Sequence, residues 1–237
     1  MQLRSLRLAL AFAFLSTAAL AAATTDTAPA GTPGGATVET PAPGAPAGDM
    51  KLGMPRVQNP AELAVAGPLG DMAMGDPKAK VTIIEYASMT CPHCARVANE
   101  TFPALKEKYI DTGKVYFIFR EFPLDDLALA ASMLARCAPP EKYFPTIKIL
   151  FEMQENWAAA ADPGAALYGY LAPMGFTEES FNSCLQDQKV LDGVTAVRDR
   201  AEQKFGVRGT PTFFFNGTQK VGELTIKEVD DILAPML

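Results

Sequence analysis

The chain has 237 residues, of which 49% are hydrophobic and 20% are charged, a composition sufficient for one well-packed core. Its net charge of -6 and the lack of any run rich in lysine or arginine argue against nucleic acid as a partner, because a phosphate backbone binds a basic face. A single histidine and four cysteines leave few ligands for a structural zinc site.

Residues 1–23 have the layout of an export signal. Arg4 and Arg7 precede an apolar stretch, Leu8 to Leu15, and small residues with the spacing of a cleavage site follow it. The apolar stretch is too short to span a bilayer comfortably, so a retained membrane anchor is the less favoured alternative. We therefore expect the mature chain to be exported into a compartment where disulfides persist.

Residues 24–59 are predicted to form a disordered tether. Between Thr24 and Gly48 the sequence consists almost entirely of Ala, Pro, Gly and Thr, which cannot bury enough apolar surface to offset the entropy lost on ordering. Beyond the tether, we expect a short helix near Ala61 to Ala66. A surface stretch that ends at Gly75-Asp76-Pro77 follows, and it is expected to pack on the domain without contributing chemistry.

A buried strand, Lys80 to Tyr86, is followed by a short turn and then by Cys91-Pro92-His93-Cys94 at the start of a helix. Pro92 occupies the first helical position, where its missing N–H costs nothing. Unpaired N–H groups and the positive end of the helix dipole favour an anion at Cys91, so its thiol should ionise more readily than a free one. Cys94 is expected to be less exposed and to act as the second, resolving sulfur. A structural disulfide or half of a zinc site is the alternative.

The helix that begins at Cys91 leads to a second buried strand. Pro103 interrupts its apolar pattern, which predicts a kink or a restart near Thr101. Gly113 then precedes the strand Lys114 to Phe119. A strand, a crossover helix and a strand of these lengths predict parallel pairing with a right-handed crossover.

A block of helical patterns runs from Asp125 to Phe205. Its first helix extends to Cys137, and Asp125 and Asp126 are placed for the cap and the first turn. Further apolar periodicities predict four more helices, namely Tyr143 to Met153, Gly164 to Leu171, Thr177 to Leu185 and a last one that contains Val190 to Phe205 and stops at Gly206.

The last part of the chain returns to strands. An aromatic run after Thr210-Pro211 is separated from Thr218 to Glu223 by Asn216-Gly217, a strong signal for a hairpin. A capping box, Thr225-Ile-Lys-Glu228, then opens the final helix.

The Cys-Pro-His-Cys motif after a strand, the helical block and Thr210-Pro211 before an aromatic strand together resemble the DsbA-like thiol:disulfide oxidoreductases of the thioredoxin superfamily. The resemblance implies an α/β fold class, with a thioredoxin-like fold over residues 60–122 and 208–237 and a helical insertion at residues 123–207. It also implies a cis bond between Thr210 and Pro211 beside the redox cysteines, where an extended substrate can pair with the backbone. The best-known members carry valine where this chain has Thr210.

Glu85 lies on the first buried strand, between Ile84 and Tyr86. It is either a solvent-facing side chain, which strand alternation allows, or a buried carboxylate with a raised pKa. Its place six residues before Cys91 matches the buried acid of DsbA-like proteins. That match implies a proton acceptor for Cys94.

Cys137 and Cys184 each lie on the apolar face of a predicted helix. If Cys91 pairs with Cys94, the only other pair is Cys137 with Cys184, and an exported protein favours such a structural disulfide. The alternative is two buried, unreactive thiols.

The resemblance implies an exported oxidase that donates the Cys91–Cys94 disulfide to folding periplasmic proteins. Its expected partners are unfolded proteins that carry cysteines and a membrane thiol oxidase that reoxidises it. We expect a monomer with no metal and no cofactor besides the redox-active disulfide.

His93 is expected to donate a hydrogen bond to the Cys91 sulfur or, when protonated, to pair with it. Two other functions fit the same residues. The first is a disulfide isomerase or reductase on the same fold, because direction depends on redox partners. The second is a Cu(I)-binding module that uses Cys91, Cys94 and Met89.

Overall fold

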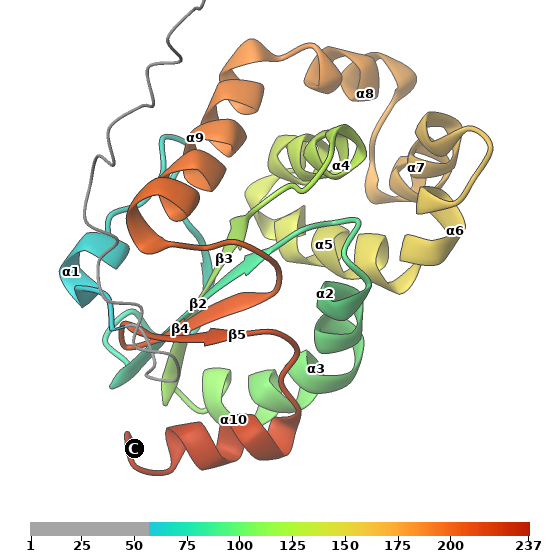
Figure 1. Cartoon of the computed structure of the whole chain (residues 1–237). Helices are drawn as coiled ribbons and strands as arrows, with labels where there is room; N and C mark the ends of the chain where they lie inside the picture. The colour runs from blue at the N-terminus through green and yellow to red at the C-terminus, as the bar shows by residue number, and fades with distance from the viewer. Residues whose placement is uncertain (1–56) are drawn as a thin grey trace, which may run out of the picture. The chain divides into compact units, whose positions relative to one another are not determined.

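The computed structural model describes residues 57–237, so the expected export signal and almost all of the expected tether lie outside the described residues. The described chain forms a five-stranded sheet in the order β1-β3-β2-β4-β5 (Figure 1). The strands are β1 (Met72–Met74), β2 (Val81–Ala87), β3 (Val115–Glu121), β4 (Thr212–Phe215) and β5 (Thr218–Val221). The pair β2 and β3 is parallel, as the sequence predicts, and the other three pairs are antiparallel.

Both faces of the central strand β2 are covered. Ile83 belongs to a core shared with the redox helix and the insertion, whereas Ile84 and Tyr86 point to the opposite face and pack with Phe214. A strand that is buried on both sides needs apolar residues at nearly every position. This explains why most of the segment is β-branched or aromatic and why alternation alone could not place Glu85.

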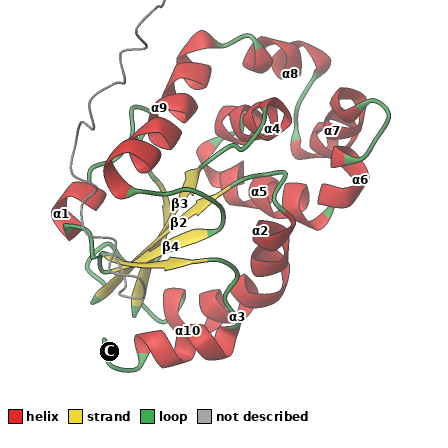
Figure 2. Ribbon diagram, in the orientation of Figure 1, coloured by secondary structure: helices red, strands yellow, loops and turns green. Residues whose placement is uncertain are grey.

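Helices from different parts of the chain cover the two faces. One face packs against α2 (Pro92–Arg96), α3 (Phe102–Leu105) and α10 (Ile226–Leu233), and the other against α1 (Pro60–Leu63) and α9 (Gln188–Phe205). Figure 2 shows this arrangement of helices around the strands.

The helix that starts at the redox motif is interrupted, as Pro103 predicts. A π-helical segment, Val97–Thr101, separates α2 from α3, and a second one, Lys106–Ile110, follows α3. Pro103 has no N–H to donate within the helix, so the regular hydrogen-bond pattern breaks around it.

The helical insertion leaves the sheet after β3 and returns at β4. It contains α4 (Asp126–Cys137), α5 (Tyr143–Glu152), α6 (Gln154–Ala158), α7 (Pro163–Leu171), α8 (Glu178–Leu185) and α9. Asp125 caps α4 by accepting a hydrogen bond from the Ala128 N–H, as expected. The expected fold class, a thioredoxin-like sheet interrupted by a helical insertion, is confirmed.

A buried ion pair fastens the insertion to the end of β3. Glu121 is fully buried and accepts hydrogen bonds from Arg136 of α4 and from the Tyr143 hydroxyl of α5. Loss of one partner would leave a buried charge uncompensated, so the three groups act as a unit.

Three local predictions have clear outcomes. The stretch before Gly75 packs on the domain as expected, but it contains strand β1, which was not predicted and whose Met72 pairs with Phe119. The strand has only three residues, too few to show a strand period. The hairpin is confirmed, with Asn216 and Gly217 in the positive-φ conformations of its turn (φ 45° and 92°).

The capping box of the last helix is also confirmed, since the Thr225 and Glu228 side chains each bind the other residue's backbone N–H. Between residues 57 and 237, no helix combines the length and the apolar character needed to cross a bilayer.

Candidate active site

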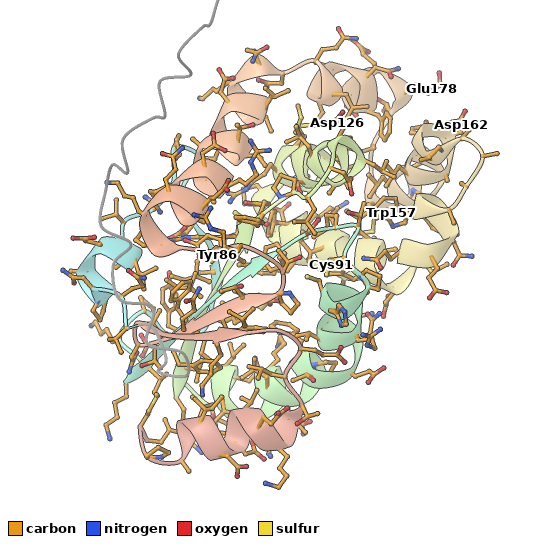
Figure 3. The ribbon with its side chains drawn as sticks, viewed as in Figure 1. Tyr86, Cys91, Asp126, Trp157, Asp162 and Glu178 are labelled. Atoms are coloured by element: carbon orange, nitrogen blue, oxygen red, sulfur yellow. A yellow bond between two sulfur atoms is a disulfide. The ribbon has the colours of Figure 1, made fainter. Side chains whose placement is uncertain are left out.

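Cys91 is the N-cap residue of α2, directly after the turn that follows β2. Its backbone is extended (φ -81°, ψ 117°), and Pro92 takes the first helical position. The sulfur therefore lies at the end of the helix where N–H groups lack partners within the helix. Cys91 is 5% exposed and Cys94 is fully buried, so Cys91 is the more accessible of two largely buried free thiols. Figure 3 shows Cys91 where α2 begins.

The surroundings of Cys91 stabilise its thiolate. They lower the pKa of Cys91 to about 5, mainly because the Cys94 thiol donates a hydrogen bond to it. Burial opposes this effect, while the Thr210 side chain and the backbone N–H groups of Cys94 and His93 assist it. The same burial raises the pKa of Cys94 well above its ordinary value. The two sulfurs thus differ strongly in how readily they carry charge.

The loop before β4 lies against Cys91. The Thr210-Pro211 peptide bond is cis, the isomer that the resemblance implies. The Cys91 thiol donates a hydrogen bond to the main-chain carbonyl of Thr210 over 3.3 Å. The Thr210 hydroxyl is buried and has no hydrogen-bond partner among the described residues, so it is free to donate to the sulfur once Cys91 ionises.

Glu85 is buried on β2, on the same side of the sheet as Ile83. Burial, and secondarily the charge of Cys91, raises its pKa to about 8. Its register partners are Phe119 on β3 and Phe213 on β4, which offer no charge to compensate a carboxylate. The charge of Glu85 in turn contributes to the raised pKa of Cys94. A carboxyl group that titrates near neutrality therefore lies close to both sulfurs.

A cavity of about 390 Å³ lies beside Glu85, between the redox helix and α5. Most of its lining is apolar and aromatic, including Phe102, Phe119 and Phe151. Glu85 is the buried acidic group in its lining, and the charged side chains of Lys106, Lys148 and Glu152 also border it. The cavity gives the buried carboxyl group a neighbouring space that is not filled by side chains.

His93 is not placed as expected. Its side chain is exposed, and its Nδ1 atom lies 3.0 Å from Oε2 of Glu223 and 2.6 Å from Nη2 of Arg96. The contact of His93 with the Cys91 sulfur comes from its backbone N–H, not from the imidazole. The expectation of a side-chain hydrogen bond to Cys91 is therefore corrected. A carboxylate 130 positions further along the chain competes for the ring.

Comparison with known proteins agrees with this geometry. A family model described as "Thioredoxin" matches residues 69–234. The crystal structure of Wolbachia pipientis alpha-DsbA1 is 34% identical, superposes with a TM-score of 0.69, and the match covers 76% of this chain and 96% of that one. This chain belongs to the DsbA-like branch of the thioredoxin family.

Two further proteins are similar to this chain, one in sequence and one in fold. A protein of Rickettsia bellii named "Putative protein-disulfide oxidoreductase" is 36% identical over 150 residues, which is 63% of this chain but only 58% of that protein. The crystal structure of BdbD from Bacillus subtilis (oxidised) has a TM-score of 0.63 at 20% identity and covers 70% of this chain and 92% of that one, which supports the fold alone.

In this DsbA-like chain, the insertion supplies two contacts to the redox turn that the sequence did not reveal. Gln154 of α6 donates from Nε2 to the carbonyl oxygens of Met89 (2.8 Å) and Cys91 (3.0 Å). The Thr90 hydroxyl donates to the carboxylate of Asp125 over 2.6 Å. Asp125 was expected only as a helix cap, and helix α6 was not predicted, so Gln154 had no signal that could have marked it.

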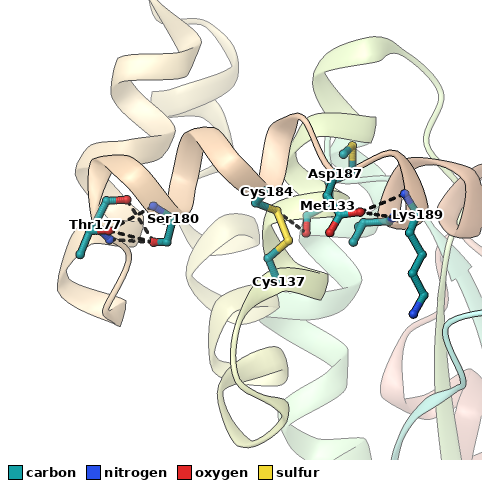
Figure 4. The surroundings of a disulfide bond; sticks show 8 residues. Met133, Cys137, Thr177, Ser180, Cys184, Asp187 and Lys189 are labelled. Carbon is teal, nitrogen blue, oxygen red and sulfur yellow. Dashed lines mark hydrogen bonds between the residues drawn. A yellow bond between two sulfur atoms is a disulfide. The ribbon is translucent and has the colours of Figure 1, made fainter.

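The second cysteine pair of the DsbA-like chain lies within the insertion. Cys137 at the end of α4 is bonded to Cys184 of α8 (Figure 4). The sequence left open whether Cys137 and Cys184 form a disulfide or remain free thiols, and in the structure they form the disulfide. Among the described residues, no group of three or more His, Cys, Asp or Glu side chains is arranged to hold a metal ion.

Proposed function

We propose that this chain is a thiol:disulfide oxidoreductase whose oxidised form donates the Cys91–Cys94 disulfide to folding exported proteins. The observation that carries the proposal is the depressed pKa of Cys91 at the N-terminus of α2. A thiolate that is stable in the reduced protein makes the disulfide readily reducible, and so makes it an oxidant of other thiols.

Transfer begins when a substrate thiolate attacks Cys91 Sγ. The new bond joins the substrate sulfur to Cys91, and the electron pair of the broken bond goes to Cys94. Because the pKa of Cys94 is raised, Cys94 takes up a proton as it leaves. A second substrate thiolate then attacks the first substrate sulfur and expels Cys91 as a thiolate. The substrate thereby loses two electrons and gains a disulfide.

Glu85 is the proposed proton donor to Cys94 in this step and the acceptor when the protein is reoxidised. A pKa of about 8 means that the carboxyl group is mostly protonated near neutrality yet close enough to exchange its proton. The cavity beside Glu85 offers a place for water to carry that proton onward.

The cis Thr210-Pro211 loop is the proposed substrate-binding element. Its backbone lies beside Cys91, as the contact between the sulfur and the Thr210 carbonyl shows. An extended peptide could hydrogen-bond to this backbone and bring its cysteine to the sulfur. Such main-chain contacts do not depend on sequence, which suits an enzyme that acts on many unfolded proteins.

The proposed compartment is the bacterial periplasm, and the support for it is the export-signal pattern of residues 1–23. An oxidising compartment also fits the disulfide between Cys137 and Cys184. A catalytic cycle then requires a membrane thiol oxidase that regenerates the Cys91–Cys94 disulfide. We propose that the enzyme acts as a monomer without a metal.

The proposal is tested by mixing the oxidised protein with a reduced peptide that carries two cysteines. We expect the peptide to be oxidised rapidly on mixing. We also expect the redox equilibrium with glutathione to favour the reduced form of the enzyme. A strongly reducing equilibrium would favour the isomerase or reductase alternative. Copper retained through purification without chelator would favour the Cu(I) module.

A further inference from the structure

Glu223 lies outside the redox motifs, yet its carboxylate contacts two side chains of α2. It follows β5, and its two oxygens accept hydrogen bonds from Arg96 Nε at 3.0 and 2.9 Å. Its Oε2 also lies 3.0 Å from His93 Nδ1. We refer to these three side chains as the His93–Arg96–Glu223 cluster. It lies on the surface beside the turn that carries Cys91.

The cluster occupies the imidazole of His93 and the guanidinium of Arg96, the two basic side chains nearest in sequence to Cys91. His93 follows Cys91 by two residues, and a protonated imidazole there is suited to pair with a thiolate. The pKa of Arg96 is raised, first by its hydrogen bond to Glu223 and more weakly by the charges of Glu223, Glu100 and Cys91. The Cys91 thiolate and Arg96 thus attract each other, while the carboxylate of Glu223 competes for Arg96 and for the His93 ring.

We infer that Glu223 is a positioning residue that holds the His93 side chain and the Arg96 charge off the Cys91 sulfur. By doing so it limits the stability of the Cys91 thiolate. The inference rests on the proposed oxidoreductase function and adds to it a residue that sets how oxidising the Cys91–Cys94 pair is. It also accounts for the exposed His93 ring that points away from the site where it was expected.

The direction of the effect follows from the charges. Without the carboxylate of Glu223, the His93 ring keeps only its contact with Arg96 Nη2 at 2.6 Å, and Arg96 keeps an uncompensated charge. The Cys91 thiolate therefore becomes more stable. A more stable thiolate favours the reduced enzyme and makes the disulfide a stronger oxidant. The groups are exposed, so the effect is modest, about half a pKa unit or a roughly threefold change in equilibrium constant.

The test compares E223Q with the native protein. The Cys91 pKa is measured from the pH dependence of its alkylation rate, and the redox equilibrium is measured against glutathione. We expect E223Q to lower the Cys91 pKa by about half a unit and to shift the equilibrium about threefold toward the reduced enzyme. The matched control is E202Q, which removes the carboxylate of another exposed pair, with Arg208 Nη1 at 2.7 Å. It should change neither value.

A second pair of variants shows whether Glu223 acts through His93. In an H93A background, E223Q should shift the Cys91 pKa by no more than half as much as in the native background. An unchanged or higher Cys91 pKa in E223Q, or an equal shift in both backgrounds, would overturn the inference. A native Cys91 that titrates like an ordinary thiol would instead contradict the proposed function. In that case the difference in Cys91 pKa between E223Q and the native protein still shows whether Glu223 influences Cys91.

Discussion

Cys91 and Cys94 lie three residues apart at the start of a helix, whereas Cys137 and Cys184 are separated by 47 positions and join two helices of the insertion. The first pair consists of free thiols whose pKa values are shifted in opposite directions. The second pair is bonded. The same residue type is therefore present as a free thiol at one site and as a disulfide at the other.

The difference shows that surroundings decide what a cysteine does. Cys91 has backbone N–H groups, the Cys94 thiol and the Thr210 loop around its sulfur, so its charged form is stabilised. Cys137 and Cys184 instead close a long loop between helices, where a disulfide restricts the unfolded chain. We expect Cys91 and Cys94 to catalyse thiol–disulfide exchange, and the Cys137–Cys184 disulfide to stabilise the fold.

Removing cysteines from each pair in turn should give the largest difference between them. The variant C91S should lose all oxidation of a dithiol peptide, because Cys94 alone cannot form the disulfide that accepts the two electrons. The double variant C137S/C184S should oxidise the same peptide at close to the native rate at a temperature where it remains folded. Peptide oxidation, followed by mass spectrometry, is the measurement. Activity that survives in C91S would refute the assignment.

The same double variant also measures how much the Cys137–Cys184 disulfide stabilises the protein. A disulfide that closes a loop of this length is expected to stabilise a protein by about 4 kcal/mol through the entropy of the unfolded chain. Denaturant unfolding of oxidised C137S/C184S should show a loss of that order. Unfolding that matches the native protein would mean that the bond contributes little.

Glu85 connects the redox pair to the stability of the sheet. Its folded pKa of about 8 lies above its ordinary value of 4.5, so the folded protein holds a proton that the unfolded chain releases. The contribution of Glu85 to stability should therefore be fully present below pH 4.5, be lost as the pH rises, and level off above about 8. In oxidised E85Q this decline should disappear, with a gain at high pH of up to about 5 kcal/mol, since the pKa rises from 4.5 to about 8 and each pKa unit corresponds to about 1.4 kcal/mol.

Unfolding by denaturant at several pH values measures the effect. The exposed Glu155 provides the control, since E155Q should follow the native profile. Parallel profiles for E85Q and the native protein would show that Glu85 ionises normally.

Gln154 lies on the insertion but contacts the redox turn. Its replacement therefore tests whether the insertion influences Cys91. In Q154A the carbonyl oxygens of Met89 and Cys91 lose a donor, which should cost about 1–2 kcal/mol of stability. The Cys91 alkylation rate should also change, because its turn is held less firmly. The exposed Gln203 serves as the control, and Q203A should leave both values as they are. Equal effects from the two variants would deny Gln154 a positioning role.

Features that depend on neighbouring residues could be predicted from the sequence. Pro92 after Cys91 marks the start of a helix, Asn216-Gly217 marks a hairpin, and Thr225 with Glu228 marks a cap. In each case the physical cause lies within four residues. The parallel pairing of β2 and β3 was also predictable, because the crossover between them has the length of a helix.

Features that depend on distant residues could not be predicted. His93 was expected on the sulfur beside it, but its partner Glu223 is 130 positions away. Gln154 binds the Cys91 carbonyl across 63 positions. Strand β1 is short, and only its pairing with β3 makes it a strand. Contacts of this kind arise from the folded arrangement and leave no local pattern.

The most direct measurement of the central claim is the pH dependence of Cys91 ionisation in the reduced protein, followed by alkylation rate with Cys137–Cys184 left intact. If the Cys94 thiol, and secondarily the Thr210 loop and the N–H groups at the start of α2, stabilise the thiolate, the rate should reach half its maximum near pH 5. A midpoint near 9, the ordinary value for a cysteine thiol, would contradict the account.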